Sequence, residues 1–396
     1  MNTRISTMTE SNFSIKQALE EAGADSYFMT GDIHSADIYY VTRFLASDEF
    51  AYLQTGNGKE TLFISEMERG RAELESRVSM LRTPTDFRYR EKVKEKKDGS
   101  LAYAACIAEL LLENGAKKVA VPYSFPVFYS NYLTGAGFTI IPVKSPFLKL
   151  RSLKNPDEIE AIKSTQMAGE KAMEAAIGLI RESEEKAGIL YYKGEVLTGK
   201  KVLSVIDHTL LDFGCEAEET IVSCGEDTSN PHGTTSGPLK ANAPIILDIF
   251  PRSKTKRYFA DMTRTVLKGK ASEELKALYE TVLAAQEKGL GLVKAGALAS
   301  DVHSAVCDFF ETKGYDTYRS GAKVGFTHST GHGVGIDIHE LPGVGENKTV
   351  LEKGNVITIE PGLYYPGIGG IRIEDMVLVT ENGCENLTGL EKNFVL

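Results

Sequence analysis

The segment at residues 356–379, VITIEPGLYYPGIGGIRIEDMVLV, consists of two strand-like apolar runs around a Gly-Pro-rich turn. Each run contains one acid that interrupts it, Glu360 in the first and Glu374 in the second. The turn residues predict a hairpin, which would place the two acids side by side. Because an isolated ionised carboxylate is costly to bury, acids inside such strands need a partner or a metal ion.

A second segment, at residues 244–266, has the same arrangement. Asp248 lies in PIILDIF and Asp261 lies in RYFADMTRTV, with the polar stretch RSKTKR between them. Pairing of these two strands would bring the aspartates together. Carboxylates at such close range repel one another strongly, and divalent cations are the usual remedy. The four acids therefore predict a metal site that is built from two hairpins.

The stretch HSTGHGVGIDIHE, at residues 328–340, contains three of the seven histidines of the chain. These are His328, His332 and His339. The glycines between them allow the backbone to pass close to a ligand. An oxygen-rich site with one imidazole suits manganese, cobalt, iron or zinc. We expect at least one of the three histidines to be functional.

A faint internal repeat connects the acids with the histidines. Residues 196–214 resemble residues 297–314, and a His-Gly pair follows each copy, at His232 and at His332. Each copy then continues into two strands that carry acids. The repeat predicts two similar α+β halves that face each other, with a site between them that takes ligands from both.

Residues 1–150 are organised differently. Apolar runs that read as short strands lie at residues 27–29, 38–44, 50–53, 61–64, 119–121 and 138–142. Helical patterns lie near residues 14–23, 66–75 and 99–114, and strands interleaved with helices predict an α/β domain. Further on, Asn155 can cap a helix that begins at Pro156. These signals predict a domain boundary near residues 148–156, which gives domains 1–150 and 151–396.

The composition excludes several classes of protein. A formal net charge of −10 argues against a general nucleic-acid binder. The sequence contains no apolar run long enough to span a membrane, and its first residues lack the apolar region of a secretory signal. The five cysteines are widely spaced and form no CxxC motif, which favours buried thiols in a reducing compartment over a zinc-thiolate site. We therefore expect a cytoplasmic protein.

Taken together, these motifs resemble the metallopeptidases with the pita-bread fold: methionine aminopeptidase, aminopeptidase P and prolidase, with creatinase as a metal-free relative. The matching segments, in the order of that family, are LRSLKNPDEIEAIK, ETIVSCGEDTSNPHG, the aspartate pair, GHGVG with the following HE, EPGLY and GIRIED. The resemblance covers nearly the whole chain. It implies an α/β N-terminal domain of the creatinase and prolidase type, followed by an α+β pita-bread catalytic domain with an internal pseudo-twofold repeat.

The resemblance also implies a site with two divalent metal ions, manganese being favoured over cobalt, zinc or iron. The implied ligands are Asp248, Asp261, His332, Glu360 and Glu374. Asp261 and Glu374 would bridge both ions, Asp248 would hold one ion, and His332 and Glu360 would hold the other. Paired metal ions lower the pKa of a bound water and generate a nucleophile at neutral pH.

The resemblance assigns further roles around the metal ions. His339 would stabilise the developing oxyanion, Glu360 would carry a proton to the leaving nitrogen, and His232 would lie near the leaving group. Arg372 shares a strand face with Glu374, so it either orients Glu374 or meets a substrate carboxylate. His328 either forms a pocket wall or contacts substrate. These last two alternatives stay open at the level of the sequence.

The implied reaction is removal of an N-terminal residue from peptides whose second residue is proline. The compact chain favours an Xaa-Pro dipeptidase over an Xaa-Pro aminopeptidase, and the resemblance also suggests a homodimer. One alternative is a methionine aminopeptidase-like enzyme that accepts more second residues. The other is a catalytically inactive binding relative, which the complete ligand set argues against.

Overall fold

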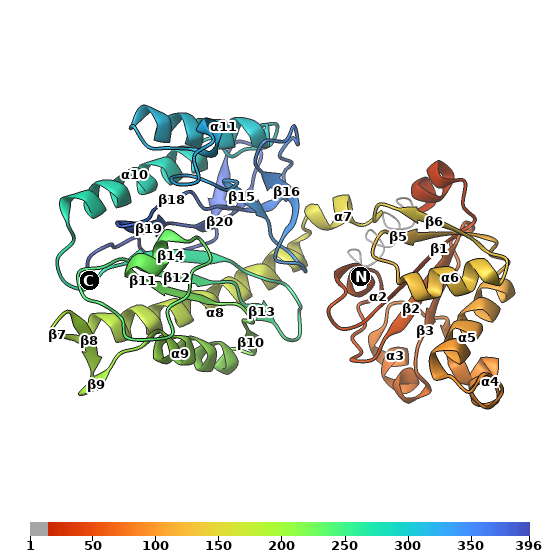
Figure 1. The fold of residues 1–396 in the computed structure, drawn as a ribbon. Helices are drawn as coiled ribbons and strands as arrows, with labels where there is room; N and C mark the ends of the chain where they lie inside the picture. The colour runs from red at the N-terminus through yellow and green to blue at the C-terminus, as the bar shows by residue number, and fades with distance from the viewer. Residues whose placement is uncertain (1–14) are drawn as a thin grey trace. The chain divides into compact units, whose positions relative to one another are not determined.

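The computed structural model describes residues 15–396, and the chain divides into two compact units on either side of the Leu150–Arg151 bond (Figure 1). The first unit is built on a six-stranded sheet with the order β4-β3-β2-β1-β5-β6. Its strands are β1 (Ser26–Gly31), β2 (Phe50–Thr55), β3 (Glu60–Phe63), β4 (Leu81–Arg82), β5 (Lys118–Pro122) and β6 (Thr139–Val143). β1 pairs antiparallel with β2 and parallel with β5, so the sheet is mixed.

The helices of this unit are α2 (Ala36–Thr42), α3 (Arg69–Glu75), α4 (Tyr89–Lys96), α5 (Gly99–Glu113) and α6 (Val127–Gly135), with 3-10 turns η1 (Glu66–Glu68) and η2 (Pro84–Phe87). The strand expected at residues 38–44 is wrong, because α2 occupies most of this run. Six of the seven α2 residues are buried, so the run is apolar on every side and shows no helical period. The helix expected near residues 14–23 is present from Ile15 onward, and Ser14 lies outside the described residues.

The second unit contains the strands of the predicted hairpins, arranged in several small sheets. The larger sheets have the orders β11-β12-β14 and β16-β15-β17-β20-β21. The strands are β7 (Glu184–Lys186), β8 (Ile189–Tyr192), β9 (Glu195–Val196), β10 (Cys215–Glu216), β11 (Ile221–Cys224), β12 (Ile245–Ile249), β13 (Arg252–Ser253), β14 (Met262–Val266), β15 (Gly331–Gly333), β16 (Glu340–Val344), β17 (Val356–Ile359), β18 (Gly362–Tyr365), β19 (Gly369–Arg372), β20 (Asp375–Val379) and β21 (Cys384–Asn386).

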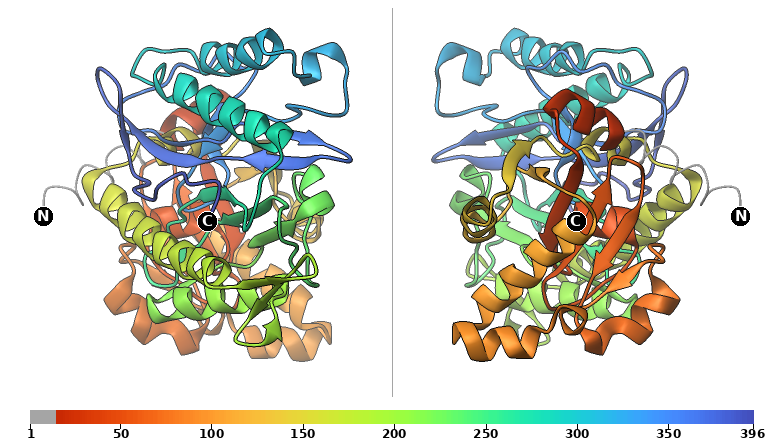
Figure 2. Two further views of the ribbon diagram at one scale, coloured as in Figure 1. Left: turned by 90° about the vertical axis from the view of Figure 1, so that its left-hand side faces the viewer. Right: turned by 90° about the vertical axis from the view of Figure 1, so that its right-hand side faces the viewer.

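Helices cover the strands of the second unit on two sides. In Figures 1 and 2, α8 (Pro156–Arg181) and α9 (Gly199–Asp212) lie on one side, and α10 (Glu273–Leu290) and α11 (Ala299–Thr312) lie on the other. The remaining helical pieces are α7 (Leu148–Ser152), η3 (Gly225–Ser229) and η4 (Tyr318–Ser320). As predicted, α8 begins at Pro156 behind an Asn155 cap, whose side chain accepts a hydrogen bond from the Glu158 backbone N–H.

The predicted repeat appears as two matched helix-and-strand halves. α9 and α11 each span 14 residues, and each is followed by a glycine with positive φ, Gly214 and Gly314. One core packs α8 and α9 against β12, and another packs α10 and α11 against Leu363 and Ile371 of the second hairpin. Between residues 15 and 396, no helix is long and apolar enough to cross a membrane.

Candidate active site

The first hairpin places the two aspartates on one face. β12 pairs antiparallel with β14, with Asp248 opposite Thr263. Asp261 lies two residues before Thr263, directly ahead of β14, so its side chain projects to the same side as that of Asp248. Residues two apart on one strand share a face, and diagonal neighbours across a ladder lie within reach of one another. The predicted hairpin is therefore present.

The second hairpin brings the two glutamates face to face. β17 pairs with β20 and β18 pairs with β19, and both ladders share one register. Glu360 and Glu374 occupy opposed positions in the short gap between these ladders. The two hairpins also join each other: the Glu374 backbone N–H donates to the Thr263 carbonyl at 3.1 Å, and the Thr263 hydroxyl donates to Glu374 Oε2 at 2.8 Å.

His332 reaches the acids from β15. Its Nε2 lies 3.4 Å from Asp261 Oδ2 and 3.4 Å from Glu360 Oε1. Its Nδ1 lies 3.1 Å from the Gly333 carbonyl oxygen, and since a carbonyl only accepts, Nδ1 carries the hydrogen. Nε2 is then the ring nitrogen that faces the carboxylates. Gly331 makes this approach possible, because a Cβ there would lie 1.9 Å from the Thr358 carbonyl oxygen.

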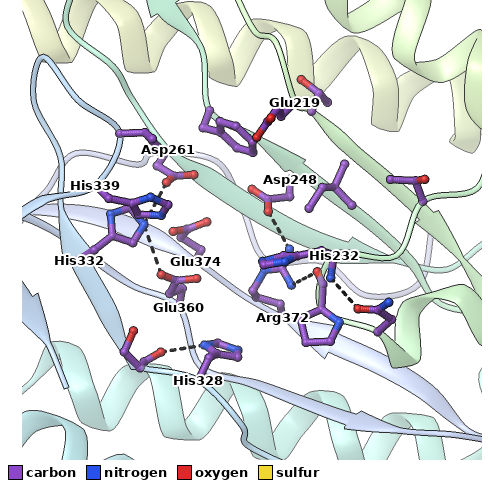
Figure 3. Close-up of a pocket in the computed structure, with 18 of the residues that line it drawn as sticks. Glu219, His232, Asp248, Asp261, His328, His332, His339, Glu360, Arg372 and Glu374 are labelled. Carbon is purple, nitrogen blue, oxygen red and sulfur yellow. Dashed lines mark hydrogen bonds and ion pairs between the residues drawn. The ribbon is translucent and has the colours of Figure 1, made fainter. Parts of the chain in front are cut away.

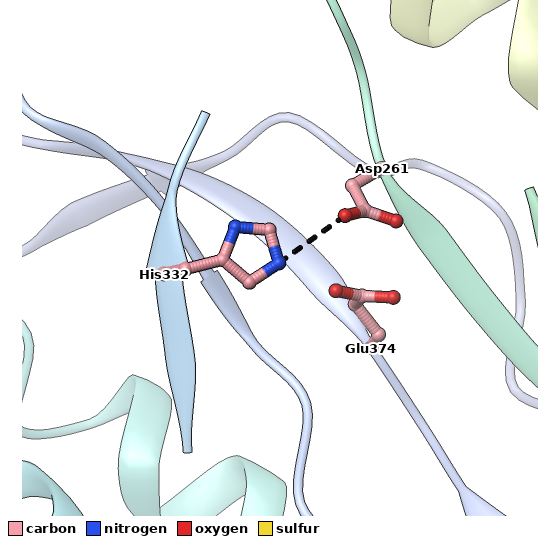
Figure 4. A group of neighbouring side chains, drawn as sticks. All are labelled: Asp261, His332 and Glu374. Carbon is pink, nitrogen blue, oxygen red and sulfur yellow. Dashed lines mark ion pairs between the residues drawn. The ribbon is translucent and has the colours of Figure 1, made fainter. Parts of the chain in front are cut away.

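Asp261, His332 and Glu374 form a group that could hold a metal ion (Figure 4). One potential ligand atom from each lies within 4.8 Å of the others. Burial, followed by the charge of Asp248, raises the pKa of Asp261 well above its ordinary value. Burial and the charge of Asp261 do the same for the pKa of Glu374, and burial raises that of Glu360. The three buried acids thus lie together without enough neighbouring positive charge to offset them.

Two carboxylate oxygens indicate where that positive charge would lie. Asp248 Oδ1 and Asp261 Oδ1 are buried, and neither has a hydrogen-bond partner among the residues that the structure describes. Unsatisfied buried anionic oxygens are expensive unless a cation meets them. Oxygen donors accompanied by one imidazole match the preferences of divalent metals such as manganese. The residues present therefore fit a metal site.

The acids and the histidines line one cavity of about 830 Å³ (Figure 3). Figure 3 shows His332 and His339 at one end of the carboxylate group, and His232 beside Arg372 at the other. Phe250 and Ile338 contribute apolar side chains to the wall of this cavity. A cavity of this size, with a few convergent polar groups and several shifted pKa values, is typical of a small-molecule or short-peptide site.

A model of metallopeptidase family M24 matches residues 160–381, which is more than half of the chain. The chain belongs to this family. It is therefore a metallopeptidase, as its sequence predicted. The convergent acids and imidazole described above lie within the matched residues.

Proteins named as Xaa-Pro dipeptidases and as an X-Pro aminopeptidase match most of the length of the chain. The Xaa-Pro dipeptidase of Pyrococcus furiosus is 29% identical over 350 residues, which cover 87% of this chain and 88% of that protein. The solved Xaa-Pro dipeptidase from Bacillus anthracis has a TM-score of 0.83 at 26% identity and covers 98% of this chain and 100% of that one. The X-Pro aminopeptidase from Thermotoga maritima MSB8 has a TM-score of 0.77 at 26% identity, with 97% and 99% covered. The expected pita-bread fold is confirmed.

In this M24 member, Arg372 connects the two hairpins. Its NH2 group donates to Asp248 Oδ2 at 2.7 Å, and its Nε lies 3.3 Å from the Thr263 hydroxyl that holds Glu374. NH1 donates to the Pro231 carbonyl at 3.0 Å and to the Tyr364 hydroxyl at 2.9 Å. These contacts occupy most of its five N–H groups, and the side chain is 4% exposed. Arg372 therefore pairs directly with Asp248 and reaches Glu374, the acid expected from the sequence, only through the Thr263 hydroxyl.

His328 continues this network away from Arg372. Its Nδ1 donates to the Ser329 carbonyl at 2.7 Å, and its Nε2 lies 3.0 Å from the Tyr364 hydroxyl. Burial, followed by the charge of Arg372, lowers the pKa of His328 to about 3, so the ring is neutral. The Tyr364 hydroxyl can then accept from Arg372 and donate to His328. His328 thus forms part of the cavity wall, and both of its ring nitrogens have partners there.

His232 and His339 retain accessible rings. The His232 backbone N–H donates to Asn230 Oδ1 at 3.2 Å, which fixes the loop but leaves the imidazole facing the cavity. The His339 ring contacts the His332 ring edge to face, with centroids 4.3 Å apart. Partial burial, followed by the charge of His332, lowers the pKa of His339. Both positions leave room for a substrate contact.

Several contributors to the M24 site were not recognisable in the sequence. Thr263 and Thr358 hold Glu374 and Glu360 through their hydroxyl groups, at 2.8 and 3.2 Å. The Tyr364 hydroxyl connects Arg372 with His328, at 2.9 and 3.0 Å. The alternation of side chains along β14 could have indicated Thr263, which shares a face with Asp261. For the other two residues, the sequence contains no comparable signal.

Proposed function

We propose that the chain is an Xaa-Pro dipeptidase that uses two divalent metal ions, with manganese favoured. The proposal rests on one observation above all: three acids and a histidine from both halves converge in one cavity of a chain similar over most of its length to an Xaa-Pro dipeptidase. Asp248, Asp261, His332, Glu360 and Glu374 would hold the ions. Residues 1–150 would form a creatinase- and prolidase-like domain, and residues 151–396 the catalytic domain.

The protein would prepare these ligands through defined hydrogen bonds. Arg372 holds Asp248 Oδ2 and leaves Oδ1 unpartnered among the described residues, so that Oδ1 is available as a ligand atom. The Thr263 hydroxyl orients Glu374, and the Thr358 hydroxyl orients Glu360. Such outer contacts fix the geometry of ligands and are a regular part of metal sites. Divalent ions held by these residues would supply an acidified water and would polarise the scissile carbonyl.

The remaining polar groups would act on the substrate. His339 would donate a hydrogen bond to the developing oxyanion of the carbonyl. Glu360, whose pKa is raised by burial, would carry a proton to the leaving proline nitrogen. His232 would contact the leaving group from the opposite end of the cavity. His328 and Arg372, predicted as possible substrate contacts, would instead support the cavity wall and Asp248.

A second candidate function is an Xaa-Pro aminopeptidase that accepts longer peptides. It is favoured by the comparable similarity to the X-Pro aminopeptidase from Thermotoga maritima MSB8. The two functions differ in whether the cavity admits residues beyond the second one. We further propose a homodimer in the cytoplasm, and the five free cysteines agree with a reducing compartment.

Hydrolysis assays separate these functions. Purified protein is loaded with MnCl₂ and given Ala-Pro, Ala-Pro-Ala or Met-Ala-Ser, and products are resolved by chromatography. We expect cleavage of Ala-Pro with little cleavage of the other two peptides. Faster cleavage of Ala-Pro-Ala would establish the aminopeptidase, and cleavage of Met-Ala-Ser would indicate a methionine aminopeptidase-like enzyme. A wild-type protein that binds Mn²⁺ but cleaves none of them would overturn the proposal.

A further inference from the structure

A buried ion cluster lies directly behind His339. The carboxylate of the next residue, Glu340, is 3% exposed and meets two cations that are almost fully buried. Arg151 NH2 lies 2.6 Å from Glu340 Oε1, and Lys154 Nζ lies 3.1 Å from Oε2. Burial acts to raise the pKa of Glu340, but the charges of Lys154 and Arg151 outweigh it and lower that pKa. Glu340 is thus an ionised acid inside the fold.

The same carboxylate organises the loop that leads to His339. Glu340 Oε1 accepts hydrogen bonds from the backbone N–H groups of Ile336 and Asp337, at 2.9 and 3.1 Å. Gly335 packs so closely that a Cβ there would lie 2.3 Å from Glu340 Oε2. The Asp337 carboxylate is also bound by Arg151, at 2.5 Å. Residues 335–340 therefore wrap around one carboxylate.

The two cations belong to the motif LRSLKNPDEIEAIK, to which no catalytic role has yet been given. Arg151 lies in α7 and Lys154 lies just before the Asn155 cap of α8. Backbone contacts anchor this short segment: Lys154 N–H donates to the Gly354 carbonyl at 2.9 Å, and Asn355 donates to the Ser152 carbonyl at 2.9 Å. The cations are therefore held by the turn that precedes β17, the strand that leads to Glu360.

Stability alone does not account for this cluster. Removing three charges from water is costly, and well-packed apolar side chains of similar volume often stabilise a fold as well as a buried ion cluster or better. Such a cluster does, however, define one loop conformation, because each buried donor and acceptor must find its partner. The orientation of His339 depends on this loop conformation. No described residue hydrogen-bonds its ring, and its ring contact is with His332. The direction of the His339 side chain is therefore set by the backbone of the loop.

We propose that Glu340, held by Arg151 and Lys154, is a positioning residue that fixes loop 335–340 and thereby aims the His339 imidazole into the cavity. This inference rests on the proposed function insofar as His339 acts on the substrate. It gives Arg151 and Lys154 a role in catalysis, because they hold Glu340 and Glu340 holds loop 335–340.

A double-mutant cycle tests the proposal. Glu340→Gln keeps the shape and an acceptor oxygen but removes the charge, and Lys154→Met removes one cation as a milder alternative. Gln166→Leu, which removes a buried hydrogen bond to Thr388 elsewhere on α8, serves as the matched control. In Mn-loaded protein we expect E340Q to lower kcat for Ala-Pro by about 10–100-fold. KM and manganese content should stay near wild type, and Gln166→Leu should leave kcat unchanged.

The cycle separates positioning from general damage. If Glu340 acts through His339, the E340Q/H339A double variant should be no slower than H339A alone. Losses that multiply in the double variant, or an E340Q enzyme as fast as wild type, would overturn the proposal. Should E340Q fail to fold, the same comparison with Lys154→Met decides the question.

Hydrogen–deuterium exchange gives a readout that does not need activity. Faster exchange confined to residues 333–344 in E340Q, and absent in Gln166→Leu, is expected even if wild type cleaves no Xaa-Pro peptide. That combination would refute the proposed function and keep the loop-fixing role of Glu340. Unchanged exchange in this loop would refute the role itself, whatever the enzyme cleaves.

Discussion

The two halves of the second unit carry matched His-Gly pairs that end in different surroundings. In the second half, His332 lies on β15 and reaches Asp261 and Glu360. In the first half, η3 and a turn replace that strand, and Gly233 donates to the Asn230 carbonyl at 2.8 Å. His232 consequently sits on a loop at the other end of the cavity. The repeat thus supplies acids from both halves, but only His332 lies beside them; in the proposed function His332 would be a ligand and His232 would remain for the substrate.

Removing a shared acid should have the largest effect, because Asp261 and Glu374 come from different halves and would serve both metal ions. Asp261→Ala or Glu374→Ala should abolish Ala-Pro hydrolysis, since each change removes a carboxylate that both metal ions would share. Steady-state assays and metal analysis after gel filtration measure this. Activity near the wild-type level in either variant would contradict the bridging assignment.

His339→Ala tests the part of the second half that would act on substrate. Loss of one oxyanion donor costs about 100–1,000-fold in kcat. The manganese content should remain at the wild-type level, because His339 is not among the proposed ligands. A variant that loses its metal ions together with its activity would instead make His339 a ligand.

The paired variants His332→Ala and His232→Ala address the asymmetry between the halves directly. His332→Ala should lose manganese affinity, whereas His232→Ala should bind manganese like wild type and slow by about tenfold, the effect of one lost hydrogen bond. Metal titration of both proteins at one pH provides the comparison. Equal loss of metal in the two variants would mean that the halves contribute equivalent ligands.

A glycine pair tests the packing that places His332, with the smallest expected effect. Gly331→Ala would push a Cβ against the Thr358 carbonyl, whereas a Cβ at Gly237 meets nothing within 4 Å. We expect Gly331→Ala to lower the free energy of unfolding by about 1–3 kcal/mol, the usual result of overpacking. Gly237→Ala should change it far less. Denaturant unfolding of both variants, with wild type alongside, checks this; equal stabilities would show that β15 has room to move.

The sequence was most informative where local chemistry was unusual. Four acids inside apolar strands predicted both hairpins. Burying a carboxylate is costly without a partner or a metal ion, so an acid within an apolar run is a signal that can be recognised in the sequence. The helix repeat and the cap at Asn155 were recognisable for the same reason, since spacing and capping are local properties. The run at residues 38–44 failed because a segment buried on all sides has no period, so strand and helix look alike.

Contacts between distant residues could not be predicted in this way. Arg372 shares a strand face with Glu374, yet its direct ionic partner is Asp248, on the other hairpin. Lys154 and Glu340 are far apart in the sequence, and no periodicity connects them. The pairing of Tyr364 with His328 depends likewise on how the second hairpin packs against the loop before β15. These partners are set by tertiary packing, which a single sequence does not display.

Calorimetric titration with MnCl₂ tests most directly whether five side chains drawn from both halves hold two divalent ions. Chelator-treated wild type should take up two ions per chain, and the Asp261→Ala/Glu374→Ala double variant should take up none at the same concentrations. Wild-type protein without measurable uptake, or a double variant that binds two ions as tightly as wild type, would contradict the account.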